Sequence, residues 1–284
     1  MKNPDVTGET SLLQILGNDF WGTPLTHSGS HKSYRPLTVL TFRLNHLLHG
    51  ATPLGFHFIN VLLHSLATAL FTHLARRLNP AQSSFPVWAA GLTFAAHPVH
   101  CEAVAGVVGR ADVLACIFFL LSLLSYIQYC VYRDRLRLQR ARDAMTSQTA
   151  TSSEPGSFIS VSYRLQRQTS SHSRYNQAAI NYSNTTDAQT SSWHHDSHSK
   201  HSISSSGDDV NRDVSSVAKW AWLALSGACA LCSMLSKEHG VTSLAVCAVY
   251  DVFVHSRIPI AFRTLTRIFK VSTCVYACTP SKFK

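Results

Sequence analysis

Long apolar runs alternate with polar segments along the chain, and the length of each run indicates what it forms. A hydrocarbon core about 30 Å thick requires roughly 20 apolar residues in helical conformation. Five stretches approach that length, and we expect each to be a membrane helix: Leu54–Ala75, Phe85–Val99, Val113–Tyr132, Ala218–Ser236 and Gly240–Ser256. The second is short enough to be re-entrant, and the fifth is marginal because it contains Asp251. The pattern therefore predicts an all-α integral membrane protein with about five spans.

A polar tract at 144–217, rich in Ser, Thr, His, Gln and Asn, interrupts this apolar pattern. Such a tract cannot bury enough apolar surface to offset its chain entropy, so we expect a disordered insert. It carries N-glycosylation sequons at Asn181 and Asn184. Its five histidines indicate a solvated linker rather than a metal site.

Composition and charge agree with a membrane protein. Hydrophobic residues make up 45% of the chain and charged residues only 14%, whereas an average soluble domain carries roughly 25% charged residues. A net charge of +10 is often found in proteins that bind nucleic acid, so a nucleic-acid partner must be considered. However, the arginines follow apolar spans, as at Arg76, Arg77 and within 133–142, which is typical of topology determinants. We therefore expect no nucleic-acid partner.

Orientation follows from the rule that basic clusters stay in the cytosol. This rule places 1–53, the loop within 97–112 and the turn at 237–240 on the far, lumenal side. It places the basic and then Ser/Thr/His-rich segment 133–217, and the basic tail 257–284, in the cytosol. Residues 1–20 contain neither the charged nor the apolar region of a signal peptide. We therefore expect that an upstream span is missing and that the chain is a fragment or isoform.

Three polar clusters fall on the predicted far side. The first, at 18–37, places an aromatic pair beside Asp19 and includes Arg35. This pattern is typical of a sugar- or interface-facing loop, and a turn followed by an interfacial helix explains it equally well. The second, at 97–112, brings two histidines, two acids and an arginine to a membrane boundary. Such groups are costly there unless they are paired or solvated in a cavity, so we interpret this cluster as a functional site. The third contains Lys237 and Glu238, for which a solvated loop pair is the favoured interpretation of this stretch alone.

Arg110 is suited to bind a phosphate, because its planar guanidinium donates two parallel hydrogen bonds. A salt bridge to Asp112 or Glu102 is the alternative. The spacing of His97 and His100 beside Cys101 also permits zinc, but Pro98 prevents a regular helix through the pair. We therefore expect no metal site.

His57, Asn60 and His64 recur on one face of the first predicted span. Polar contacts between packed spans are the favoured role for them, ahead of a proton relay.

Taken together, five strings resemble the family of transmembrane and tetratricopeptide-repeat O-mannosyltransferases. In chain order they are NDFWG at 18–22, SYRPL at 33–37, HPVHCEAV at 97–104, VGRAD at 108–112 and SKEHG at 236–240. The resemblance covers 3–132 and 218–256. It implies a multispanning GT-C fold in the endoplasmic reticulum membrane, and transfer of mannose from dolichyl-phosphate mannose to Ser/Thr hydroxyls of cadherin-type acceptors. It also implies an inverting displacement with a carboxylate base and basic groups on the departing lipid phosphate.

Two features depart from the family's pattern. The family's paired acidic residues, held to carry the catalytic base, follow its first span, and no Asp-Asp or Asp-Glu pair occurs within 1–53. No 34-residue tetratricopeptide period is visible either. The resemblance leaves Asp19 and Glu102 as candidate catalytic residues. The candidates for donor-phosphate or substrate binding are Arg110, Asp112, His97, His100, Arg35, Lys237 and Glu238.

The transferase expected from the resemblance uses dolichyl-phosphate mannose as its donor substrate, and the sequence indicates no certain cofactor. Two other functions are alternatives to it. A truncated relative without its base is expected to act as a catalytically inactive membrane scaffold that binds the lipid donor or a partner. A transporter or metal channel is expected to use histidines, namely His57, His64, His97 and His100.

Overall fold

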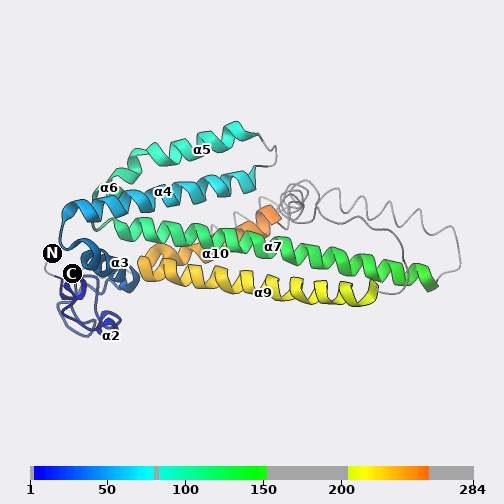
Figure 1. The fold of residues 1–284 in the computed structure, drawn as a ribbon, viewed down its shortest axis with the longest axis horizontal. Helices are drawn as coiled ribbons and strands as arrows, with labels where there is room; N and C mark the ends of the chain where they lie inside the picture. Colours follow the sequence, from blue (N-terminus) through cyan, green and yellow to red (C-terminus); the bar gives the residue numbers. More distant parts are fainter. Residues whose placement is uncertain (1–2, 80–82, 152–203, 256–284) are drawn as a thin grey trace, which may run out of the picture. The chain divides into compact units, whose positions relative to one another are not determined.

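The computed structural model describes residues 3–79, 83–151 and 204–255 (Figure 1). Helices make up most of these ranges, which contain no strand beyond an isolated bridge between Asn18 and Pro24. The α-helices are α1 (Pro4–Thr7), α2 (Leu12–Ile15), α3 (Pro36–His49), α4 (Pro53–Leu78), α5 (Ser84–Ala96), α6 (Cys101–Ala105), α7 (Arg110–Thr151), α9 (Ser204–Ser236) and α10 (Thr242–Val249). Two 3₁₀ turns, η1 (Pro98–His100) and η2 (Glu238–Val241), and a π-helical segment, Tyr250–His255, complete them. The predicted all-α class is confirmed for the described residues.

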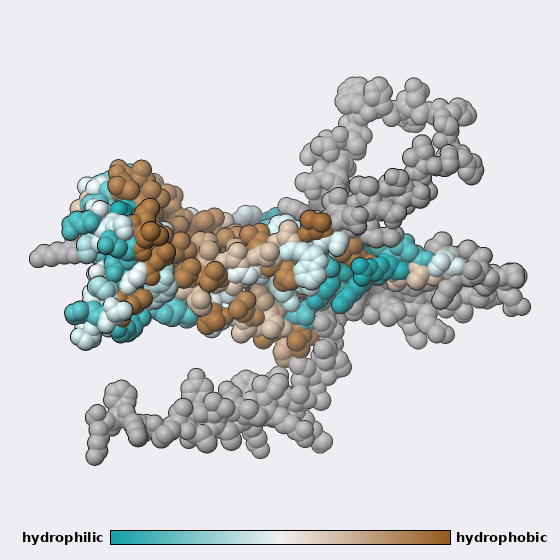
Figure 2. All heavy atoms as spheres, turned by 90° about the horizontal axis from the view of Figure 1, so that it is seen from below, coloured by the Kyte–Doolittle hydropathy of each residue, from teal (hydrophilic) through white to brown (hydrophobic). Residues whose placement is uncertain are grey.

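Three of the described helices are long and apolar enough to cross a membrane: α4, the Arg110–Ala141 part of α7 and the Ser216–Ser236 part of α9. They match the first, third and fourth predicted spans. On the face drawn in Figure 2, hydrophobic residues cover the middle of the helices and hydrophilic residues gather toward the ends. The 13 residues of α5 extend only about 20 Å at 1.5 Å per residue, less than the hydrocarbon thickness. The chain is a multi-pass α-helical membrane protein.

The predicted fifth span, 240–256, is not one continuous α-helix. Its first residues belong to η2, α10 provides only eight helical residues, and the π-helical segment follows from Tyr250. The boundary between two compact units, residues 1–244 and 245–284, also falls within this stretch. The site described below lies entirely in the first unit.

The helices α7 and α9 both extend into the predicted linker. The basic stretch after Tyr132 continues α7 to Thr151, and α9 begins at Ser204 rather than at the predicted Ala218. Residues 152–203, with both sequons, and the whole predicted basic tail, 257–284, lie outside the described residues.

Hydroxyl groups connect α7 to α9, which pack side by side (Figure 1). The Ser122 and Ser226 side chains each donate to the other residue's backbone carbonyl, at 2.9 Å, and Ser233 Oγ donates to the Ala115 carbonyl at 2.8 Å. All three serines are buried. Helices in lipid associate through small residues and such hydrogen bonds, because the apolar environment offers no hydrophobic drive between them.

The segment before the first span folds into what we call the N-terminal cap, residues 3–49. The sequence predicted a lumenal loop here, with a turn followed by an interfacial helix as the alternative for 18–37. Instead, Val6, Ile15 and Phe20 pack with residues of α3 and α4 into one hydrophobic core, whose other buried members are Val39, Phe42 and Phe56. Pro36 starts α3, because proline at the first turn of a helix sacrifices no hydrogen bond. The cap thereby fixes the residues just before α3 against the ends of the spans.

Candidate functional site

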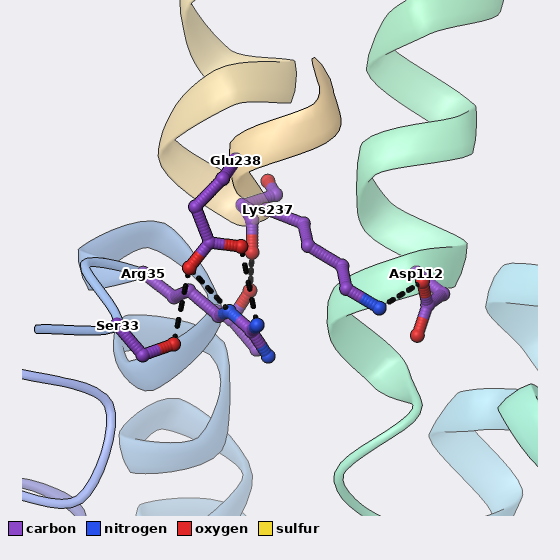
Figure 3. Close-up of polar contacts among 7 residues, drawn as sticks. Ser33, Arg35, Asp112, Lys237 and Glu238 are labelled. Carbon is purple, nitrogen blue, oxygen red and sulfur yellow. Dashed lines mark hydrogen bonds and ion pairs between the residues drawn. The ribbon is translucent and has the colours of Figure 1, made fainter. Parts of the chain in front are cut away.

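Residues from three distant parts of the sequence meet beside the start of α3. Ser33 and Arg35 precede α3, Asp112 lies in the first turn of α7, and Lys237 and Glu238 follow α9 (Figure 3). We call these five residues the ionic site. The predicted topology puts all three segments on the lumenal side, at one end of the spans, and the structure places them in contact.

Arg35 and Glu238 form a two-pronged ion pair. Arg35 Nε donates to Glu238 Oε1 at 3.2 Å and Nη2 donates to Oε2 at 3.1 Å, while Ser33 Oγ donates to Oε1 at 3.1 Å. Phe20 lies against the guanidinium, with its ring centroid 5.3 Å from Cζ. The Arg35 side chain is 18% exposed and that of Glu238 is 52% exposed. Solvent can therefore reach the carboxylate that the arginine holds.

The pKa of Glu238 lies below its ordinary value. Partial burial acts to raise this pKa, but hydrogen bonds from its own backbone N–H, from Arg35 and from Ser33, together with the arginine's charge, outweigh that effect. Each of these contacts favours the ionised carboxylate.

Lys237 donates to Asp112 Oδ1 in the second ion pair of the site. Both side chains are partly exposed, Lys237 by 25% and Asp112 by 39%. Two close contacts hold the turn that carries Lys237. Thr38 Oγ1 donates to the Ser236 carbonyl at 2.9 Å, and Gly240 lies so near Ser233 that a Cβ there would approach its backbone to 2.3 Å.

Arg110 lies away from these ion pairs and is fully buried. Its Nε donates to Asn60 Oδ1 at 2.7 Å, and its Nη2 donates to Asn45 Oδ1 at 2.8 Å and to the Phe56 carbonyl at 3.0 Å. The guanidinium also stacks over Phe42, 4.6 Å from the ring centroid. We call this set the Arg110 network.

The Arg110 network gives this arginine a structural position that sequence analysis did not predict. Every acceptor it uses is neutral, so the alternative of a salt bridge to Asp112 or Glu102 is wrong. Asn60 also donates to the carbonyls of Val104 and Gly106, at 3.3 and 3.1 Å. Its bond with Arg110, at the start of α7, is the predicted polar contact of Asn60 between two spans. The sequence did not predict a role for Asn45; its signal was a polar residue three positions after the apolar Phe42, on the same face of a helix.

Asp19, a predicted catalytic residue, is buried with all its acceptor positions in use. Its Oδ1 accepts from the backbone N–H groups of Trp21 and Thr23, at 2.9 and 3.0 Å. Its Oδ2 accepts from Ser30 Oγ at 2.7 Å and from the N–H of His31 at 3.1 Å. Burial acts to raise the pKa of Asp19, but these hydrogen bonds lower it below its ordinary value. In this geometry the carboxylate organises the loop of the cap.

Glu102, the other predicted catalytic residue, is exposed on α6. Its side chain makes no hydrogen bond or ion pair with any described residue, and none joins it to the ionic site. Helix α6 packs closely against Gly109, since a Cβ at that position would lie only 2.4 Å from the backbone of Ala103. Glu102 is therefore a carboxylate available to a ligand.

His97 precedes, and His100 ends, the 3₁₀ turn that replaces regular helix at Pro98, as expected from that proline. His97 Nδ1 accepts from the N–H of Val99 at 3.2 Å and so caps the turn. The ring of His100 lies 4.5 Å from that of Phe94 and 5.3 Å from that of His64. Burial, and then the two neighbouring histidines, lower the pKa of His100. Within residues 3–79, 83–151 and 204–255, no group of three or more His, Cys, Asp or Glu could hold a metal ion.

Comparison with known proteins identifies relatives over most of the chain. The human protein O-mannosyl-transferase TMTC2 is 40% identical over 268 residues, which are 94% of this chain and 22% of that protein. Drosophila melanogaster Tmtc1 is 54% identical over 134 residues, which cover 47% of this chain and 15% of that protein. Human TMTC3 is 48% identical over 126 residues, or 44% of this chain and 13% of that protein.

No protein-family model and no solved structure matches the chain. The chain spans about one fifth of the length of the TMTC2 relatives that it matches. Identities of 40–54% over these lengths agree with the five strings seen in the sequence. The chain belongs to the TMTC family of protein O-mannosyl-transferases.

Proposed function

We propose that the chain is a membrane portion of a protein O-mannosyltransferase of GT-C type, and that its ionic site binds the phosphate of dolichyl-phosphate mannose. The observation that carries this proposal is the convergence of Arg35, Lys237 and Glu238 with Asp112 at one end of the spans. The relatives' names supply the reaction class, and the donor, the cadherin-type acceptor and the endoplasmic reticulum follow from the family resemblance.

The geometry of Arg35 supports phosphate binding. A guanidinium that holds a carboxylate with two parallel hydrogen bonds presents the same donors to a phosphate. Lys237 adds a second, more compact charge. Both cations are partly exposed, whereas Arg110 is enclosed by neutral acceptors. We therefore assign the donor phosphate to Arg35 and Lys237, and give Arg110 the task of holding the cap on the spans.

The reaction in this proposal breaks the bond between the anomeric carbon of mannose and its phosphate oxygen. The Ser/Thr hydroxyl oxygen of the acceptor forms the new bond on the opposite face, and its proton passes to a carboxylate. Among the predicted acids of the chain, Glu102 is exposed and makes no polar contact with a described residue, while Asp19 has its acceptor positions occupied. Glu102 is thus the stronger candidate within these residues, and Arg35 and Lys237 stabilise the negative charge on the leaving phosphate.

One observation favours the alternative of a non-catalytic scaffold: every acceptor position of the Asp19 carboxylate is already occupied by a hydrogen bond. A loop carboxylate that accepts four hydrogen bonds from its own loop has a structural task. In that case the ionic site would bind the lipid donor without turnover. Donor binding and mannose transfer must therefore be measured separately.

The experiment uses microsomes from cells lacking related transferases in which the full chain is expressed. Labelled dolichyl-phosphate mannose and a cadherin domain are supplied, and both retained donor and mannosylated domain are measured. We expect Lys237→Met and Arg35→Gln to reduce donor retention at unchanged chain abundance. Arg76→Gln is the matched control, because it removes one exposed positive charge in the last turn of α4, about 35 Å from that helix's start.

The outcomes separate the two functions. Retention with transfer that Glu102→Gln abolishes supports the enzyme and its base. Retention without transfer supports the scaffold. If both ionic-site variants retain donor as Arg76→Gln does, the ionic site is not the donor site.

A further inference from the structure

The N-terminal cap exposes a group of leucines immediately before the first span. Leu44, Leu47 and Leu48 of α3 are exposed by 58, 73 and 65%. Leu12, Leu13 and Leu16, in and beside α2, are exposed by 62, 80 and 52%, and α2 contacts α3. We call these six residues the leucine surface. Large exposed apolar groups of this kind mark contact sites in soluble and membrane proteins alike.

The leucine surface is not needed for the core of the cap. On α3, the residues that face the core are Val39, Phe42 and Asn45, all buried. Leu44, Leu47 and Leu48 are spaced i, i+3 and i+4, so they form a separate stripe on the same helix. Helix α3 is therefore apolar on two sides, and folding of the cap covers only one of them.

We infer that the leucine surface lies in the lipid interface, with α2 and α3 resting on the membrane beside the entry of α4. The chain reverses at Gly50, whose φ of 64° favours glycine, and α4 begins at Pro53. The outward residues of the first turns of α4 continue the exposed apolar set, with Leu54 at 82% and Phe58 at 57%. Since α4 is a membrane span, its exposed apolar side faces lipid, and the leucine surface is continuous with it along the chain.

The charge around the α3 part of the leucine surface favours lipid over a protein partner. The sequence contains no acidic residue between Asp19 and Glu102. From residue 20 to the end of α3, every charged side chain is therefore basic, including Lys32 and Arg43, and two histidines lie in the last turn of α3. A helix with apolar residues on one side and basic residues beside them is typical of binding at a phospholipid surface. Trp21, 54% exposed, adds an aromatic group of the kind enriched at that depth.

A photo-reactive residue tests this placement in the membrane. A diazirine side chain replaces Leu47 or Leu13 of the full chain in microsomes, and irradiation is followed by mass analysis of the adducts. Phe58, on the outward side of α4, calibrates the yield of lipid adducts. Glu9 is the matched control, because it is exposed on the same cap but is charged and outside the leucine surface.

We expect lipid adducts at Leu47 and Leu13 in yields comparable with Phe58 and several-fold above Glu9. A protein adduct at Leu47, whether to a second copy or to another chain, would overturn the inference. Equal lipid labelling at Leu47 and Glu9, or labelling at Phe58 alone, would overturn it as well. The result does not depend on donor binding or mannose transfer, so it stands or falls separately from the proposed function.

Discussion

Two arginines of this chain, Arg110 and Arg35, lie in opposite environments, although both belong to strings that carry the resemblance to the family. Arg110 is fully buried, donates to two asparagine side chains and to backbone carbonyls, and stacks on aromatic rings. Arg35 is partly exposed and holds an exposed carboxylate. The Arg110 network thus builds the fold, and the ionic site is left available to a ligand.

The comparison teaches that the partners of a charged group separate its roles better than its residue type does. A buried cation with neutral acceptors cannot exchange them for a ligand without leaving those acceptors unpaired. An ion pair exposed to solvent contributes little to stability and can exchange one anion for another at small cost. The predictions below test whether the two arginines differ in this way.

The largest effect is expected for Arg110→Met. This change leaves Asn45, Asn60 and the Phe56 carbonyl without their donor, and each buried unpaired group costs about 1–3 kcal/mol. We expect destabilisation of about 3 kcal/mol or more and loss of the folded cap. The measurement is the fraction of monodisperse chain in mild detergent after heating, with Arg76→Met as control. A variant that keeps its thermal stability but loses donor retention would show that Arg110 binds the phosphate after all.

The pattern of the sequence predicted correctly those features that depend only on the length of an apolar run or on the chemistry of one residue. The spans α4, α7 and α9 follow from runs of about 20 apolar residues, and the break at Pro98 follows from the missing N–H of proline. The contacts of Arg110 were beyond such rules, because its acceptors lie 50 and 65 residues away on α4 and α3. The cap was missed because Val6, Ile15 and Phe20 are spaced irregularly and form a core only when α3 and α4 complete it. Family strings identified four members of the ionic site but could not pair them.

The next effect concerns the backbone that supports the ionic site. Gly240→Ala places a Cβ 2.3 Å from the backbone of Ser233, which cannot move as a flexible side chain would. Overpacking of this kind costs about 1–3 kcal/mol, and the shift would displace Lys237 and Glu238. Thermal stability and donor retention should therefore fall together. Gly227→Ala on α9 is the control, because its Cβ would meet nothing within 4 Å; it should equal or slightly exceed the wild type. Equal stability of the two variants would contradict the close packing.

Asp19→Asn tests the structural role assigned to the loop carboxylate. The amide replaces one carboxylate oxygen, an acceptor, by an NH2 group that can only donate. At least one of the donors of Trp21, Thr23, Ser30 and His31 therefore loses its acceptor. We expect a cost of about 1–3 kcal/mol, seen as faster proteolysis within the cap. Folding lowers the pKa of Asp19, so its contribution to stability is fully present at any pH above its ordinary pKa near 3.8. That contribution is lost as the pH falls through the pKa of Asp19 in the folded chain. A variant with an intact cap but no mannose transfer would instead favour the catalytic assignment.

The smallest effect on stability is expected for Glu238→Gln, and it gives the sharpest test of the comparison. Glu238 is half exposed, so loss of its pair with Arg35 should cost less than about 1 kcal/mol. Folding lowers the pKa of Glu238 below its ordinary value near 4.5, so the pair contributes its full stability at any pH above that value. This contribution is lost as the pH falls through the pKa of Glu238 in the folded chain. Thermal stability of wild type and variant should therefore differ slightly at neutral pH and converge in acid. Because a neutral amide competes less strongly for Arg35 than a carboxylate does, donor retention by the variant at neutral pH should rise or stay unchanged. A loss of retention as large as that of Arg35→Gln would mean that Glu238 contacts the donor itself, and that the arginine and the carboxylate act on it together.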